Sequence, residues 1–100
     1  MSGIRLWVDD ERPAPDGWRW AKTSSEAIGR LAGVYSDDPS PVTELSLDHD
    51  LGGDDTTRPV VLWLCEHGSW PETVRVHTAN PVGRDWLVGM VDRYGPGVVK

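Results

Sequence analysis

The first apolar run of the chain is Ile4-Arg5-Leu6-Trp7-Val8, and it stops at the pair Asp9-Asp10. The run is short and rich in residues that favour β-structure, as expected for a buried strand. A second run, Thr43 to Leu47, stops in the same way at Asp48-His49-Asp50. The sequence therefore predicts two strands that each deliver aspartates to a polar edge of a sheet.

Two more strands and a short tail complete the expected sheet. Residues 18–22 alternate between large aromatic and other side chains, which suits an edge strand whose two faces differ in polarity. A fourth strand is expected over 73–77. The apolar tail 97–100 could begin a fifth strand.

Local capping signals predict three helices between and after these strands. Thr23-Ser24-Ser25-Glu26 matches a capping box, and the helix that it opens should run to about Ala32. The run 59–67 could be a buried strand or a helix opened by proline, and we favour the helix because a strand follows directly. Asn80-Pro81 is typical of an N-cap followed by a first-turn proline, so a helix is expected through about Tyr94.

Length and element order indicate the fold class. One hundred residues suffice for a single domain over 1–100. Alternating strands and helices predict an α/β fold with a mainly parallel four-stranded sheet. Residues 9–17 contain Pro13, Pro15 and Gly17, so a loop should stand there in place of a helix. The loop is long enough to return the next strand parallel to the first, and an antiparallel hairpin is the alternative.

Composition narrows the partners and the compartment. Sixteen acidic and ten basic residues give a formal net charge of -6, which disfavours binding along an extended nucleic-acid backbone and favours a small ligand or one bound only by its end. Cys65 is the only cysteine, so a disulfide framework is excluded and a reducing, cytoplasmic compartment is expected. Since no apolar stretch approaches the roughly 20 residues of a membrane span, we expect no membrane insertion.

Aspartates at two strand ends form the candidate metal site. In a parallel sheet, the carboxyl ends of the strands share one edge, where ligands collect. We therefore expect Asp9, Asp10, Asp48 and Asp50 to lie together, and oxygen ligands of this kind suit Mg²⁺ or Mn²⁺. Asp10 and Asp48 would bind directly, and Asp9 directly or through water. The alternative is that these acids are ordinary solvated strand caps.

Two histidines beside the aspartates are candidates for proton transfer. An imidazole changes charge near neutral pH and could give a proton to a leaving group or take one from a nucleophile. We prefer His77, at the expected end of the fourth strand, and keep His49 as the second candidate. Packing and structural hydrogen bonding are the alternatives for both. Asp48 is the third candidate catalytic residue, as a metal ligand or as a phosphoacceptor.

A phosphate cradle is expected where the last helix begins. Free amides at a helix start bind anions, and Thr78, Asn80 and Arg84 surround the start at Pro81. Helix capping alone is the alternative for Asn80. Arg12 follows the first acidic pair and either reaches the same phosphate or neutralises its acidic neighbours.

Three motifs carry a resemblance to a known family. They are Leu6-Trp7-Val8-Asp9-Asp10-Glu11-Arg12-Pro13, Ser46-Leu47-Asp48-His49-Asp50-Leu51-Gly52 and His77-Thr78-Ala79-Asn80-Pro81-Val82-Gly83. In this order they resemble the cyclic-phosphate processing receiver-like family. The resemblance implies a small receiver-like, flavodoxin-like fold of three layers, and metal ligation by the Asp50 backbone carbonyl. It also implies action on cyclic phosphates such as those that end damaged RNA.

Three functions follow as hypotheses. The leading one is a Mg²⁺- or Mn²⁺-dependent phosphoesterase that opens a cyclic nucleotide or an RNA 2′,3′-cyclic end. The second is a non-enzymatic receiver-like module that is phosphorylated on Asp48 or sequesters a phosphorylated ligand. The third is an interaction domain whose acidic rim is incidental. The separations from Asp48 to Thr78 and from Thr78 to Lys100 resemble those in receivers, so Lys100 is a candidate for the receiver lysine.

Overall fold

The computed structural model describes residues 3–34 and 40–99. Within them the chain forms four strands and three helices: β1 (Ile4–Val8), β2 (Trp18–Ala21), α1 (Ser24–Ala32), β3 (Val42–Leu47), α2 (Arg58–His67), β4 (Thr73–Val76) and α3 (Pro81–Tyr94). The strands form one sheet of order β2-β1-β3-β4, and every pair of neighbours is parallel. The α/β class, the parallel sheet and the helix over 59–67 are thus confirmed.

The orientation of β2, which the sequence left open, is parallel to β1. Trp20 lies opposite Trp7 and Ala21 lies opposite Val8 in the register of the pair. Residues 9–17 form a loop without helix or strand, as expected, and bring the chain back to the start of the sheet. The hairpin alternative is therefore excluded.

The expected fifth strand is reduced to one bridge. Val98 pairs in parallel with Val74, and the Val99 amide donates to the Val74 carbonyl at 2.9 Å. The tail thus extends the sheet beside β4 by a single contact. Lys100, the candidate receiver lysine, lies outside the described residues.

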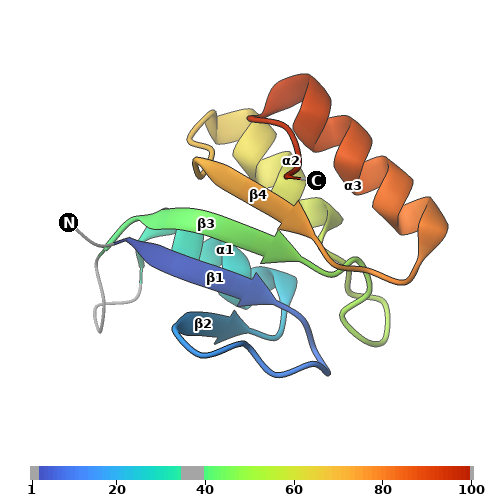
Figure 1. The fold of residues 1–100 in the computed structure, drawn as a ribbon, viewed down its shortest axis with the longest axis horizontal. Coiled ribbons are helices and arrows are strands. Elements are labelled where there is room, and N and C mark those ends of the chain that lie inside the picture. The colour runs from blue at the N-terminus through green and yellow to red at the C-terminus, as the bar shows by residue number, and fades with distance from the viewer. Residues whose placement is uncertain (1–2, 35–39, 100) are drawn as a thin grey trace.

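The helices of the described residues lie on one face of the sheet. Parallel crossovers are right-handed, so steps in opposite directions along the sheet cross opposite faces. The step from β1 to β2 runs one way, and every later step runs the other way. Figure 1 shows α1 and α2 behind the sheet, and α2 contacts both α1 and α3. We expected helices on both faces of the sheet, which gives three layers. The connection that would carry a helix across the other face is the loop 9–17, so within the described residues helices cover one face only.

The two faces of the sheet accordingly differ in chemistry. The covered face supplies a core that includes Leu6, Val8, Leu45, Leu47 and Val74, all fully buried. We call the opposite side the open face, and the strand registers give its residues as Arg5, Trp7, Trp18, Trp20, Glu44, Ser46, Thr73 and Arg75. The open face is thus aromatic and polar where the covered face is aliphatic.

Capping interactions fix the helix ends near the strand ends. The Thr23 hydroxyl accepts from the Glu26 amide at 3.0 Å, as the capping box predicts, but the Glu26 carboxylate accepts from the Lys22 amide rather than that of Thr23. Asn80 Oδ1 accepts from the Gly83 amide at 3.0 Å and opens α3. No helix in the described part of the chain has the length and hydropathy of a bilayer-crossing segment.

Candidate functional site

The carboxyl ends of β1, β3 and β4 meet at one cavity of about 290 Å³. Backbone hydrogen bonds continue one residue past the strands, because the Asp48 amide donates to the Val8 carbonyl and the His77 amide to the Leu47 carbonyl, each at 2.9 Å. The rim residues are thus held by the sheet itself. The cavity is lined by Asp9, Asp10, Glu11, Arg12, Asp48, Asp50, Gly52, Thr78, Ala79 and Asn80.

Three carboxylates converge on one side of this cavity. Asp9, Asp10 and Asp48 each offer an oxygen, and the three atoms lie within 4.8 Å of one another. Within the described residues, the Asp10 carboxylate has no hydrogen-bond or ion-pair partner. Gly52 has φ +85, and a Cβ there would lie 3.0 Å from Asp10 Oδ2, so a side chain would crowd the carboxylates. The donor set and the space beside it fit a hard divalent cation such as Mg²⁺ or Mn²⁺.

Asp9 is the most firmly held of the three. It is fully buried, and its Oδ1 accepts from the amides of Glu11 and Arg12, both at 2.9 Å. Its Oδ2 lies 3.1 Å from His77 Nε2 and 3.2 Å from Arg12 Nε. Burial raises the pKa of Asp9, but the two amides and His77 outweigh it, so the pKa stands below its usual value. Asp9 is therefore an ionised carboxylate at neutral pH.

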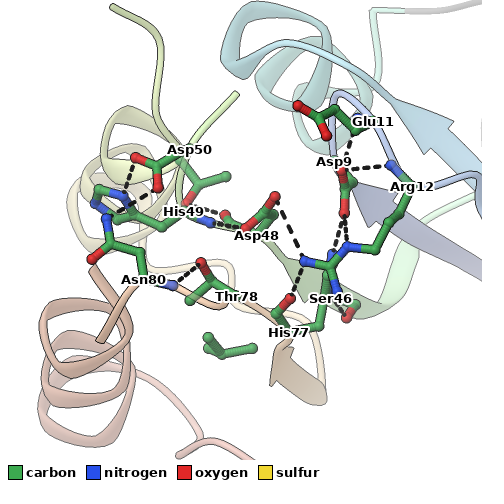
Figure 2. A network of polar contacts seen from close by, with 12 residues as sticks. Asp9, Glu11, Arg12, Ser46, Asp48, His49, Asp50, His77, Thr78 and Asn80 are labelled. Carbon is green, nitrogen blue, oxygen red and sulfur yellow. Dashed lines mark hydrogen bonds and ion pairs between the residues drawn. The ribbon is translucent and has the colours of Figure 1, made fainter. Parts of the chain in front are cut away.

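His77 lies behind Asp9 in a hydrogen-bonded chain. Its Nδ1 is 2.7 Å from Ser46 Oγ and its Nε2 faces Asp9 (Figure 2). Its ring stacks on Trp7 with centroids 3.8 Å apart. Burial lowers the pKa of His77 more than Asp9 raises it, which favours the neutral ring. The network then assigns the proton to Nε2, which donates to Asp9, while the Ser46 hydroxyl donates to Nδ1. Both ring nitrogens are engaged, and His77 is not among the cavity-lining residues.

His49, the second candidate for proton transfer, also stands outside the cavity lining. It is 6% exposed, its Nδ1 lies 3.0 Å from Asp50 Oδ1, and its Nε2 accepts from Arg58 Nε at 2.9 Å. Its ring fills the space beside Gly83, where a Cβ would meet the ring at 2.3 Å. These contacts give His49 a packing role under α3.

Thr78 and Asn80 both line the cavity as expected, and each keeps one side-chain donor. Thr78 Oγ1 accepts from the Asn80 amide at 3.2 Å, which leaves its hydroxyl hydrogen for a ligand. Asn80 Oδ1 accepts from the Gly83 amide, and Nδ2 donates one hydrogen to Asp50 Oδ2 at 3.0 Å, which leaves the second Nδ2 hydrogen. Asp50 is correspondingly tied to Asn80 and His49, and those bonds hold the pKa of its carboxyl below the usual value.

Of the two candidate arginines, the structure places Arg12 at the cavity and Arg84 outside its lining. Arg12 lines the cavity, and its Nη2 donates to the His77 carbonyl at 2.8 Å and lies 3.9 Å from Asp48 Oδ2. Arg84 is not among the lining residues, and its Nη1 donates to the Val76 carbonyl at 3.2 Å. Arg12 is thus the guanidinium that a ligand in the cavity would meet.

Several residues that support the site were not predicted from the sequence. Trp7 is half-buried on the open face, and Trp20 Nε1 donates to the Asp9 carbonyl at 2.6 Å. Thr57 is fully buried and donates from Oγ1 to the Asp48 carbonyl at 2.6 Å. Ser46 could have been found, because strand alternation places it on the face opposite the aliphatic Leu45 and Leu47.

Comparison with known proteins bears on the family. None of the curated proteins and none of the solved structures compared with the chain matches it significantly. The family described as the cyclic-phosphate processing receiver domain matches residues 4–93, a range that contains all three strand-end motifs. The chain therefore belongs to the cyclic-phosphate processing receiver domain family.

Proposed function

We propose that this protein is a metal-dependent phosphoesterase that opens a cyclic phosphate on a nucleotide or an RNA end. One observation carries the proposal: three carboxylates within 4.8 Å of one another share a cavity with a guanidinium and a hydroxyl donor. Carboxylates suit the metal, and Arg12 with Thr78 suits a phosphate. Membership of a cyclic-phosphate processing family supports the choice of substrate class.

The chain's own residues divide the work between binding and support. Asp9, Asp10 and Asp48 would hold Mg²⁺ or Mn²⁺, which when bound neutralises the carboxylates and polarises a phosphate oxygen. Thr78 would donate its hydroxyl hydrogen to the phosphate, and Arg12 would donate from its guanidinium. Ring opening adds water across one P–O ester bond, with the hydroxyl going to phosphorus and the proton to the leaving alkoxide.

The contacts of His77 favour a supporting part over the direct proton transfer that we expected from the sequence. A direct proton donor must reach the leaving oxygen, whereas both nitrogens of His77 are bonded to Asp9 and Ser46. We propose that His77 positions Asp9 and keeps its carboxylate ionised. Protonation of the leaving group then falls to solvent in the cavity.

A turnover assay tests the proposal. Purified protein is incubated with 2′,3′-cyclic nucleotides, 3′,5′-cyclic nucleotides and cyclic-phosphate-ended RNA, with Mg²⁺, Mn²⁺ or EDTA. We expect metal-dependent product that is lost in Asp48→Asn and retained in Asp54→Asn, since Asp54 lies outside the cavity lining. Absence of turnover on every substrate with every metal, at high enzyme concentration, would overturn the enzymatic reading.

A non-enzymatic receiver-like module is the second candidate, and the placement of Asp48 favours it. Asp48 has one oxygen on the His49 amide at 2.8 Å, and the other, Oδ2, approaches the cavity guanidinium. A carboxylate held in this way could accept a phosphoryl group. Treatment with acetyl phosphate should then add one labile phosphoryl mass that disappears in Asp48→Asn, and an unchanged mass would exclude phosphorylation on Asp48.

A further inference from the structure

Arg12 is the only cationic side chain that lines the cavity within the described residues. Its Nε lies 3.2 Å from Asp9 Oδ2, and its Nη2 lies 3.9 Å from Asp48 Oδ2. The same two oxygens belong to the carboxylates proposed to hold the divalent cation. Arg12 therefore stands where it neutralises part of the site when no cation is bound.

We propose that Arg12 is a built-in counter-ion, which a divalent cation displaces from the carboxylates and thereby releases to bind the phosphate of the ligand. The inference rests on the proposed function, because it assumes the metal site. It goes further by coupling the two ligands through one side chain. Metal first frees the guanidinium, and the freed guanidinium then strengthens phosphate binding.

Charge balance gives the first argument. Three neighbouring carboxylates repel one another, and one guanidinium offsets only part of that charge. A divalent cation among the same oxygens offsets more of the negative charge, and it repels a guanidinium a few ångströms away. The cation and Arg12 therefore compete for Asp9 and Asp48.

The backbone of Arg12 is held by contacts that do not involve its side chain. The Arg12 amide donates to Asp9 Oδ1, and the Arg12 carbonyl accepts from Trp7 Nε1, each at 2.9 Å. Both contacts belong to the main chain of Arg12. The side chain is 55% exposed and held by the His77 carbonyl and the two carboxylates. Displacement of the guanidinium thus breaks no buried packing.

The coupling has a sign that binding measurements can check. If metal frees Arg12 for phosphate, phosphate must strengthen metal binding by the same factor. Removing the Arg12 charge should then have opposite effects on the two ligands. Metal alone should bind more tightly, and phosphate should bind more weakly.

Titration of ¹⁵N-labelled protein with MgCl₂, followed by NMR, tests these signs with and without inorganic phosphate. The variants are Arg12→Gln, Arg12→Lys, which keeps the charge, and Arg93→Gln, which removes an equal charge from the last turn of α3. Arg12→Gln should bind Mg²⁺ alone about three- to tenfold more tightly than wild type, as expected for loss of one competing ion pair. Arg93→Gln should match wild type, and Arg12→Lys should lie closer to wild type than Arg12→Gln does.

Two further measurements distinguish displacement of the Arg12 guanidinium by Mg²⁺ from simple charge repulsion between Arg12 and Mg²⁺. The Arg12 Nε–H signal of the wild type should shift with Mg²⁺, and phosphate should strengthen Mg²⁺ binding more in wild type than in Arg12→Gln. Equal or weaker Mg²⁺ binding by Arg12→Gln, or an unmoved Nε–H signal, would overturn the counter-ion inference and leave the metal site standing. If no variant and no wild-type protein binds Mg²⁺, the proposed metal site fails as well.

Discussion

A methyl group added at Gly83 should destabilise the protein, although alanine is the better helix former. Gly83 lies in the first turn of α3, and a Cβ there would stand 2.3 Å from His49 Cγ and 2.7 Å from its Nδ1. His49 has little freedom to retreat, because it is buried and bonded at both nitrogens. The clash must therefore be relieved by shifting the ring or the helix.

Two opposing effects set the expected change in the unfolding free energy of Gly83→Ala. Overpacking of this kind costs about 1–3 kcal/mol. Replacement of glycine by alanine within a helix returns up to about 1 kcal/mol. We expect Gly83→Ala to lose about 1–2 kcal/mol of unfolding free energy. Gly89 supplies a control in the same helix, because a Cβ there meets nothing within 4 Å. Gly89→Ala should gain about 0.5–1 kcal/mol.

Urea unfolding followed by tryptophan fluorescence measures both variants against wild type. A change of 1 kcal/mol corresponds to about 4–8 °C in Tm for a domain of this size, so thermal melts provide a second reading. In the double variant His49→Ala/Gly83→Ala, the added methyl group should cost less than it does alone. If Gly83→Ala proves as stable as Gly89→Ala, the packing of His49 against α3 is wrong.

The remaining predictions concern the carboxylates and their supports. Asp10→Asn should weaken Mg²⁺ binding in calorimetry and raise the unfolding free energy of the metal-free protein by about 0.5 kcal/mol, since it removes a repelling charge. The variant His77→Gln removes the ring that contacts Asp9, and it should lower the affinity for Mg²⁺ by roughly tenfold. Because the folded state holds the pKa of His77 below its unfolded value of 6.5, its stabilising contribution is complete above that pH. Urea unfolding at a series of pH values should therefore show wild type losing stability as the pH falls below 6.5 and His77→Gln losing less. Ser46→Ala leaves the part-buried His77 Nδ1 without its donor and should cost about 1–2 kcal/mol in the same assay.

Local signals explain why much of the fold was predictable from the sequence. Asn80 and Pro81 define the start of α3 within one turn, and the structure begins that helix at Pro81. The Thr23 cap and Gly33, which has φ 74, bracket α1 in the same way. Both signals are carried by residues within a few positions of the helix end, so no distant contact was needed to interpret them.

Side-chain direction was less predictable, because it depends on contacts between distant segments. The sequence placed His49 and His77 beside the aspartates, but it did not show that neither ring lines the cavity. His49 is buried by Gly83, thirty-four positions later, and His77 is fixed by Asp9, sixty-eight positions earlier. Such pairs become visible only when the sheet order and register are known.

The loop that replaces a helix after β1 has a consequence for the chemistry of Asp9. A helix on the open face would bury the strand ends beneath aliphatic side chains, whereas here Trp7 and Trp20 lie there. Trp7 stacks on His77 and Trp20 donates to the Asp9 carbonyl, so the two rings support the His77 side chain and the Asp9 backbone. Ser46 completes the support from the next strand. The aspartate that faces the cavity is thus positioned from the side of the sheet that lacks a helix, and substitutions on that open face should affect metal binding without touching the cavity.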